Sequence, residues 1–121
     1  MERVVLAQKL ALIRDHWRPK IVGTLNGQDV KLVKFSGAFP WHHHEREDEL
    51  FLCLAGRFRV EFREEGPVEL GPGEFVIVPR GVEHRTVAEE EASVLLFEPA
   101  ATRNTGNIED PVFTAPPDVR I

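Results

Sequence analysis

The sequence contains no tyrosine and a single cysteine, Cys53. One cysteine cannot form an internal disulfide, so the composition favours a reducing, cytoplasmic compartment. Long apolar runs are also lacking: Glu2 and Arg3 open the chain, and Gln8 and Lys9 interrupt its first apolar residues. This pattern argues against a signal peptide or a membrane span. Basic residues are outnumbered by acidic ones, 15 to 20, and the net charge of -5 argues against nucleic acid as a partner.

The N-terminal segment has the periodicity of one amphipathic helix. A length of 121 residues suffices for one domain with its own hydrophobic core. Leu6, Leu10 and Ile13 recur at helical spacing, which predicts a helix over residues 2–16 that ends before Pro19. A single helix cannot form a helix-turn-helix DNA reader, which needs two.

The middle of the chain consists of short strand-forming runs separated by turns. Asn26 and Gly27 form a strong hairpin signal, and residues 58–62 alternate apolar and charged side chains as a half-exposed strand does. Such a pattern predicts an all-β barrel or sandwich with one helix added. The composition after Pro99 predicts an irregular, extended tail. The expected parts are a helical segment at 1–18, a β-barrel at 19–98 and a tail at 99–121 packed on the barrel or on a partner subunit.

The stretch 37–56, GAFPWHHHEREDELFLCLAG, concentrates the polar residues that bind metals. In a strand, His42 and His44 share one face while His43 points the opposite way. A polar turn follows, and Glu49 opens the next apolar run. Imidazole and carboxylate are ligand types that a divalent transition metal prefers. The pattern therefore predicts that two histidines and a glutamate converge from neighbouring strands.

A second stretch, 71–88 with the sequence GPGEFVIVPRGVEHRTVA, carries a turn between two strands and places Thr86 on the same face as His84. Together the two stretches resemble the two motifs of the cupin superfamily over roughly residues 20–100. The matching residues are Gly37, His42, His44, Glu49 and Gly56 in the first motif, and Gly73, Pro79, Gly81 and His84 in the second. The resemblance implies a double-stranded β-helix, or jelly-roll barrel, with one metal ion bound by His42, His44, Glu49 and His84.

Two departures from the cupin pattern affect the assignment. The first motif has one residue fewer than usual between Gly37 and its first histidine, so counting from the glycine would choose His43. Counting back from Glu49 chooses His42 and His44, and strand alternation supports that choice. The second motif commonly ends in an asparagine, which is not a ligand in the family, and Ala88 stands there. The ligand types suit Fe, Mn, Ni, Zn or Cu and do not choose among them.

The whole sequence also resembles small single-domain cupins labelled as similar to mannose-6-phosphate isomerase. The matching segments include 48–51, 82–85 and 104–106. The expected function is a metal-dependent enzyme, of the dioxygenase or isomerase type, acting on a small polar metabolite inside the barrel. Two alternatives stay open: a metallated small-molecule (sugar-like) binding module without turnover, and an interaction protein whose site is vestigial.

No catalytic residue follows from the sequence. Glu45, Glu47 and Asp48 are candidate bases for an isomerase, but they form a solvated turn more simply. The absence of tyrosine removes the acid that sugar epimerases of this fold use, and it removes the Cys–Tyr crosslink of thiol dioxygenases.

The apolar run that follows Glu49 makes further predictions about the two faces of its strand. If Glu49 points into the barrel, Phe51 and Cys53 do so too, and three leucines point outward, where they need a cover. Closed two-fold dimers are the default oligomer, so the chain is expected to be a homodimer. The outward leucines are Leu50, Leu52 and Leu54.

The aromatic residues are expected on two different faces. The phenylalanines expected to line the cavity are Phe51, Phe58, Phe62 and Phe75. The aromatics expected to face away from His42 are Phe39 and Trp41.

Overall fold

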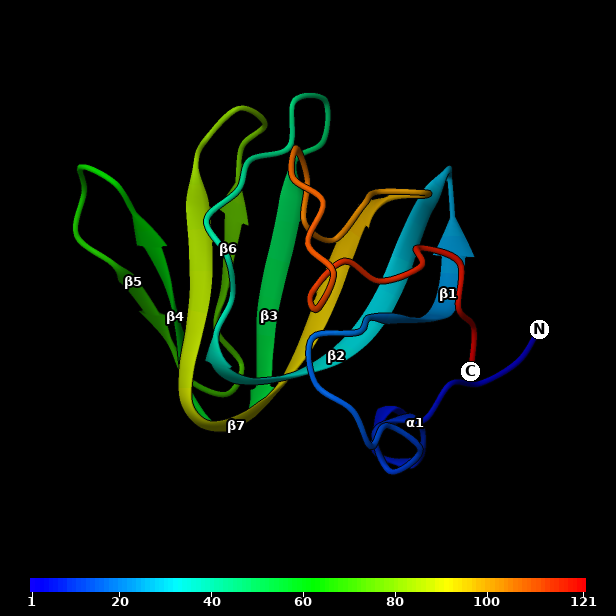
Figure 1. Cartoon of the computed structure of the whole chain (residues 1–121). Coiled ribbons are helices and arrows are strands. Elements are labelled where there is room, and N and C mark those ends of the chain that lie inside the picture. The colour runs from blue at the N-terminus through cyan, green and yellow to red at the C-terminus, as the bar shows by residue number, and fades with distance from the viewer.

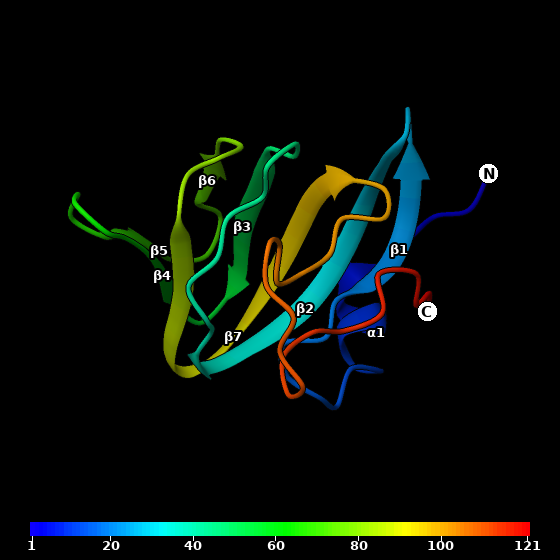
Figure 2. The same cartoon turned by 45° about the horizontal axis from the view of Figure 1, so that its top comes forward.

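A computed structural model that describes residues 1–121 shows one strongly curved antiparallel sheet and a single short helix (Figures 1 and 2). The all-β fold with one N-terminal helix, predicted from the sequence, is confirmed. The elements are α1 (Leu6–Leu10), β1 (Lys20–Leu25), β2 (Gln28–Ala38), β3 (Glu49–Ala55), β4 (Phe58–Phe62), β5 (Val68–Leu70), β6 (Phe75–Val78) and β7 (His84–Pro99). The main sheet has the order β1-β2-β7-β3-β6, and β4 pairs with both β5 and β7.

The long strand β7 connects the two walls of the fold. Its second half lies between β2 and β3, and its first half pairs with β4 and the end of β2. The register of β2 against β7 shifts between Phe35 and Gly37, where the three glutamates at 89–91 lie opposite the single residue Ser36. Extra residues on one strand bend a sheet, and both strands turn sharply in this region (Figure 2). The polar run 89–91, whose three glutamates suggest a solvated hairpin tip, instead lies within one continuous bent strand.

The hydrophobic core fills the concave side of the curved sheet. Phe51 and Cys53 point inward and are buried, as strand alternation predicted. Trp17, which precedes β1, stacks on Phe35 with ring centroids 4.5 Å apart, and its indole N–H donates to the Ser36 carbonyl over 2.9 Å. These contacts fix the chain before β1 against the inside of the barrel.

Helix α1 is shorter than the helix predicted over residues 2–16. Its N-cap residue, Val5, offers no side-chain cap, and none of the helix's own residues is buried. Short helices without caps or a packed face gain little stability, so the helix ends after Leu10. Ile13, beyond the helix, is buried instead, and its carbonyl accepts a hydrogen bond of 2.9 Å from the Lys34 ammonium. Neither this helix nor any other is long and apolar enough to cross a membrane.

The convex face of the sheet carries two rows of apolar side chains across four strands. The rows are Leu32–Leu95–Leu52–Phe75 and Val30–Phe97–Leu50–Ile77. Exposure rises along them, from 0% at Leu32 to 59% and 54% at Phe75 and Ile77 on the edge strand β6. The outward orientation of Leu50 and Leu52 agrees with the prediction. Phe75, predicted to line the cavity, lies on the opposite face of the sheet because β6 pairs Phe75 with the outward Leu52.

Candidate metal centre

Three separate segments bring the predicted ligands together. Glu49 is the first residue of β3 and His84 the first of β7, whereas His42 and His44 lie on the irregular connection between β2 and β3. His42 and His84 form an isolated antiparallel bridge, in which each backbone N–H donates to the other residue's carbonyl over 3.0 and 2.9 Å. Opposite residues of such a bridge project to the same side, so the two imidazoles meet.

The four side chains are buried, and their potential ligand atoms all lie within 4.8 Å of one another. The Oε1 atom of Glu49 lies 3.2 Å from His44 Nε2 and 3.6 Å from His84 Nε2. Two ligand atoms each bound at about 2.1 Å to one ion are roughly 3.0 Å apart at a right angle and roughly 3.4 Å apart at the tetrahedral angle. The 3.2 Å distance falls between these two values and the 3.6 Å distance lies slightly above them, so the atoms are close enough to converge on one ion after a small adjustment.

Backbone carbonyls orient two of the imidazoles. His42 Nδ1 lies 2.9 Å from the Pro40 carbonyl oxygen, and His84 Nδ1 lies 2.8 Å from that of Val82. A carbonyl accepts a hydrogen bond, so Nδ1 carries the proton and Nε2 offers its lone pair to the cluster. Outer hydrogen bonds of this kind fix the tautomer of metal-binding histidines.

The cluster also contains most of the chain's unsatisfied buried polar atoms. Four buried side-chain atoms have no hydrogen-bond partner, and three of them are His44 Nε2, Glu49 Oε1 and His84 Nε2. Leaving such atoms without a partner is costly, and native proteins rarely do so. A cation at the centre of the cluster would satisfy all three, so the residues fit a metal ion.

Electrostatics favour the ligand form of His42 and Glu49. Burial, together with the neighbouring His84, lowers the pKa of His42 to about 4. Although burial opposes ionisation, the adjacent imidazoles of His44 and His84 hold the pKa of Glu49 well below its usual range. Burial likewise lowers the pKa of His44, but the Glu49 carboxylate beside it more than offsets this and the net shift is upward. A neutral imidazole and an ionised carboxylate are the forms that bind a metal.

A buried ion pair lies behind Glu49 and was not found from the sequence. Lys31 Nζ and Glu98 Oε1 are 3.2 Å apart, and their side chains are only 2% and 1% exposed. Since Leu50 pairs with Phe97, the register places Glu98 directly opposite Glu49. Burial and the charge of Glu49 raise the pKa of Glu98 well above its ordinary value. Its Oε2 is the fourth buried atom without a partner.

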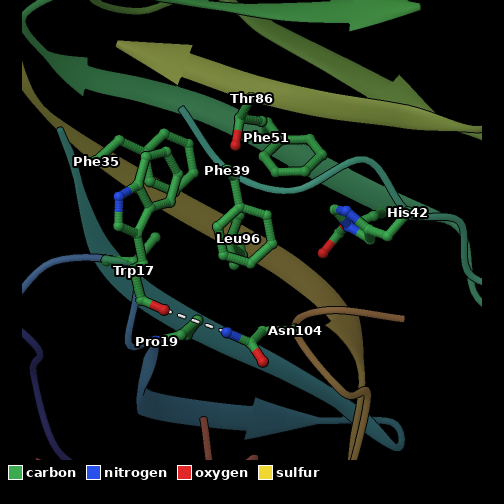
Figure 3. A pocket seen from close by; sticks show the side chains of 11 residues that line it. Trp17, Pro19, Phe35, Phe39, His42, Phe51, Thr86, Leu96 and Asn104 are labelled. Carbon is green, nitrogen blue, oxygen red and sulfur yellow. Dashed lines mark hydrogen bonds between the residues drawn. The ribbon is translucent and has the colours of Figure 1, made fainter. Parts of the chain in front are cut away.

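A cavity of about 30 Å³ lies inside the barrel next to the cluster (Figure 3). Its lining consists of Trp17, Pro19, Val33, Phe35, Phe39, His42, Glu49, Phe51, Thr86, Leu96 and Asn104. Thr86 lines it as predicted, but Phe58, Phe62 and Phe75 do not. Phe39 was predicted to face away from His42, yet the two rings are 5.3 Å apart. Residues 39–41 form no strand, so side-chain alternation does not apply there.

The C-terminal segment packs against the outer side of the histidine run. Asn107 donates its backbone N–H to the His43 carbonyl over 3.0 Å, and its side-chain oxygen accepts the His43 N–H over 2.9 Å. Gly106 lies so close to His43 that any side chain there would collide with the His43 carbonyl. His43 itself stays outside the cluster, as the strand alternation predicted.

Comparison with known proteins places this site in context. The family model described as "Cupin domain" matches residues 29–98. A cupin-2 domain containing protein from Shewanella frigidimarina is 35% identical, with a TM-score of 0.77 over 79% of this chain and 93% of the other. Protein NMB1881 from Neisseria meningitidis is 34% identical, with a TM-score of 0.75 over 81% and 99%. The uncharacterized protein YdbB of Bacillus subtilis is 34% identical over 65 residues, which are 54% of this chain and only 58% of YdbB.

Proposed function

The chain belongs to the cupin domain family, and from that premise we propose that its four clustered residues bind one divalent transition metal. The observation that carries this proposal is the convergence of three unpartnered buried atoms, from His44, Glu49 and His84, on one point. Three imidazoles and one carboxylate suit Fe, Mn, Ni, Zn or Cu. The absence of thiolates distinguishes the set from a typical closed structural zinc site.

The metal would serve a reaction of a small molecule, either dioxygenation or isomerisation. Four protein ligands leave an octahedral ion one or two positions for a substrate, and a bound metal supplies Lewis-acid or oxygen-activating chemistry there. The candidate bases of the sequence contribute little. Asp48 is held by the backbone N–H and guanidinium of Arg80 over 2.9 to 3.2 Å, and these hydrogen bonds lower the pKa of its carboxyl. Glu45 is exposed and borders the cleft beside His44, outside the barrel cavity.

A metallated binding module without turnover is the second candidate. The observation in its favour is that the carboxylates bordering the cleft beside His44, Glu45 and Glu47, are exposed or half-buried, while the barrel cavity offers no titratable side chain beyond His42 and Glu49 of the proposed ligand set. A module needs no further acid or base, whereas an isomerase needs one near its substrate.

Elemental analysis of the untagged protein tests the metal. We expect about one divalent metal per chain, and we expect His84→Ala to lose it and to melt at a lower temperature, because a bound ion stabilises the native state. His43→Ala is the matched control and should keep the metal. An unchanged metal content in His84→Ala would refute the assignment.

Assays of product formation distinguish the metal-dependent enzyme from the binding module. The iron-, manganese- and nickel-loaded proteins are each supplied with keto acids, diketones and sugar phosphates, with and without air. Product formation that His84→Ala abolishes supports the enzyme. Saturable binding without product in every loaded form supports the binding module.

A further inference from the structure

The cavity beside the metal centre is too small for a metabolite. Its volume of about 30 Å³ has room for one or two water-sized molecules. Small organic ligands usually occupy pockets of about 300 Å³ or more. A cleft of about 380 Å³ outside the barrel is bordered by His44 on the other side of the cluster, and it offers space of that size. The inner cavity therefore admits a guest of a few atoms only.

The wall of the cavity is mostly apolar. Figure 3 shows the rings of Phe35, Phe39 and Phe51 around it, with Leu96 beside them. Van der Waals contact with such a wall favours an apolar guest, because a polar one would lose its hydrogen bonds with water on entry.

The few polar groups of the cavity do not favour water. The Asn104 side chain is already satisfied: its amide nitrogen donates to the carbonyls of Trp17 and Phe113 over 3.2 and 2.8 Å, and its oxygen accepts the Ala115 N–H over 3.0 Å. Only the hydroxyl of Thr86 points into the space without belonging to the proposed ligand set (Figure 3). Buried water typically needs two to four polar partners. Once a metal engages His42 and Glu49, the single remaining hydroxyl leaves this cavity better suited to an apolar guest.

We propose that this cavity binds dioxygen. It is apolar and of diatomic size, and two of its wall residues, His42 and Glu49, belong to the cluster. Among small apolar molecules, dioxygen is the one with which a metal held by histidines and a carboxylate reacts. The proposal rests on the metal-dependent function above and deepens it, because it assigns the inner cavity to the gas and leaves the outer cleft to the organic substrate.

Paramagnetic relaxation by dissolved dioxygen tests the cavity directly. Methyl-labelled protein, metal-free and loaded with diamagnetic zinc, is equilibrated under nitrogen and then under oxygen. The methyl groups of Val33 and Leu96 line the cavity, whereas those of Leu32 and Val60 are equally buried elsewhere. We expect a several-fold larger relaxation enhancement at the cavity methyls than at these controls. Equal enhancement at both sets would overturn the proposal.

Two substitutions sharpen the test. Val33→Phe should fill the cavity and reduce the enhancement at Leu96 to the level of the controls; if that variant does not fold, Leu96→Phe is read at Val33 in the same way. Thr86→Val keeps the shape and removes the hydroxyl, so the enhancement should persist. Its loss in Thr86→Val would show that the hydroxyl, and not the apolar wall, retains the gas, and would also overturn the proposal.

The metal content of the same samples keeps this proposal separate from the proposed function. If elemental analysis finds no metal in protein that has been exposed to metal ions, the proposed function fails whatever the methyl groups show. If the metal is bound and the cavity methyls behave like the controls, the dioxygen site alone fails.

Discussion

Acidification should destabilise the metal-free protein through His42. The folded state lowers the pKa of this imidazole from 6.5 to about 4, first through burial and then through the neighbouring His84. The unfolded chain therefore binds a proton at His42 that the folded chain does not, and stability falls as the pH drops through this window. The contribution is fully present above pH 6.5 and is lost by about pH 4.

The size of the loss follows from the shift. Each pKa unit corresponds to 1.36 kcal/mol, and integration of the linkage between pH 7 and pH 4 gives about 3 kcal/mol for this one group. A domain of this size is held together by only about 5 to 15 kcal/mol, so the effect is large enough to measure.

Urea unfolding of chelator-treated protein measures the loss by comparison with His42→Asn. The asparagine amide can keep the hydrogen bond to the Pro40 carbonyl but cannot be protonated, so contributions of distant groups cancel in the difference. The stability of the wild type relative to the variant should fall by about 3 kcal/mol between pH 7 and pH 4. Phe39→Leu is the control. It removes no titratable group, so it should change the free energy of unfolding by the same amount at pH 7 and at pH 4. A difference for His42→Asn that stays constant over this range would refute the reasoning.

Further predictions concern the surroundings of the site. Lys31→Met leaves Glu98 buried without its partner and should cost roughly 3 to 5 kcal/mol in urea unfolding, whereas adding Glu98→Leu should recover most of the loss. Gly106→Ala should push the segment off the His43 carbonyl and weaken metal affinity about tenfold or more by competition with a chelating dye; unchanged affinity would show that the contact does not position the ligands. A second copy of this chain should cover the apolar rows on the convex face, so light scattering should show a dimer that Phe75→Asp dissociates, and a wild-type monomer of 13.7 kDa would contradict this.

The clustering of the four candidate ligands could be predicted because two local rules agreed. Strand alternation separated His42 and His44 from His43, and the spacing to Glu49 chose the same pair. Strand alternation gave a wrong prediction for Phe39. This residue lies in the irregular connection after β2, where side chains do not alternate between two faces, and its ring contacts His42. The burial of Phe39 depends on contacts with Phe113, 74 residues further on, whose ring lies 5.4 Å away.

The Lys31–Glu98 pair could not be predicted because its burial depends on long-range strand pairing. Each residue lies in a strand whose alternation puts it on the inward face, and charged residues are rarely found there. Only the pairing of β2 with β7 and of β7 with β3 brings Lys31 diagonally beside Glu98, and Glu98 opposite Glu49, in the barrel interior. The buried Lys31 balances part of the negative charge of the carboxylates at the site. The sequence of neither strand alone reveals this pairing.

The charges of this group explain how the site can exist without a metal. Glu49 stays ionised, and the upward shift of the His44 pKa means that this imidazole holds a proton 3.2 Å from the carboxylate more readily than a free histidine does. The pKa of Glu98 is raised beside Glu49, since two buried carboxylates cannot both ionise at low cost. A divalent cation would therefore oppose protonation of His44 and favour the ionised form of Glu98, while Lys31 lies beside Glu98 as a buried positive charge.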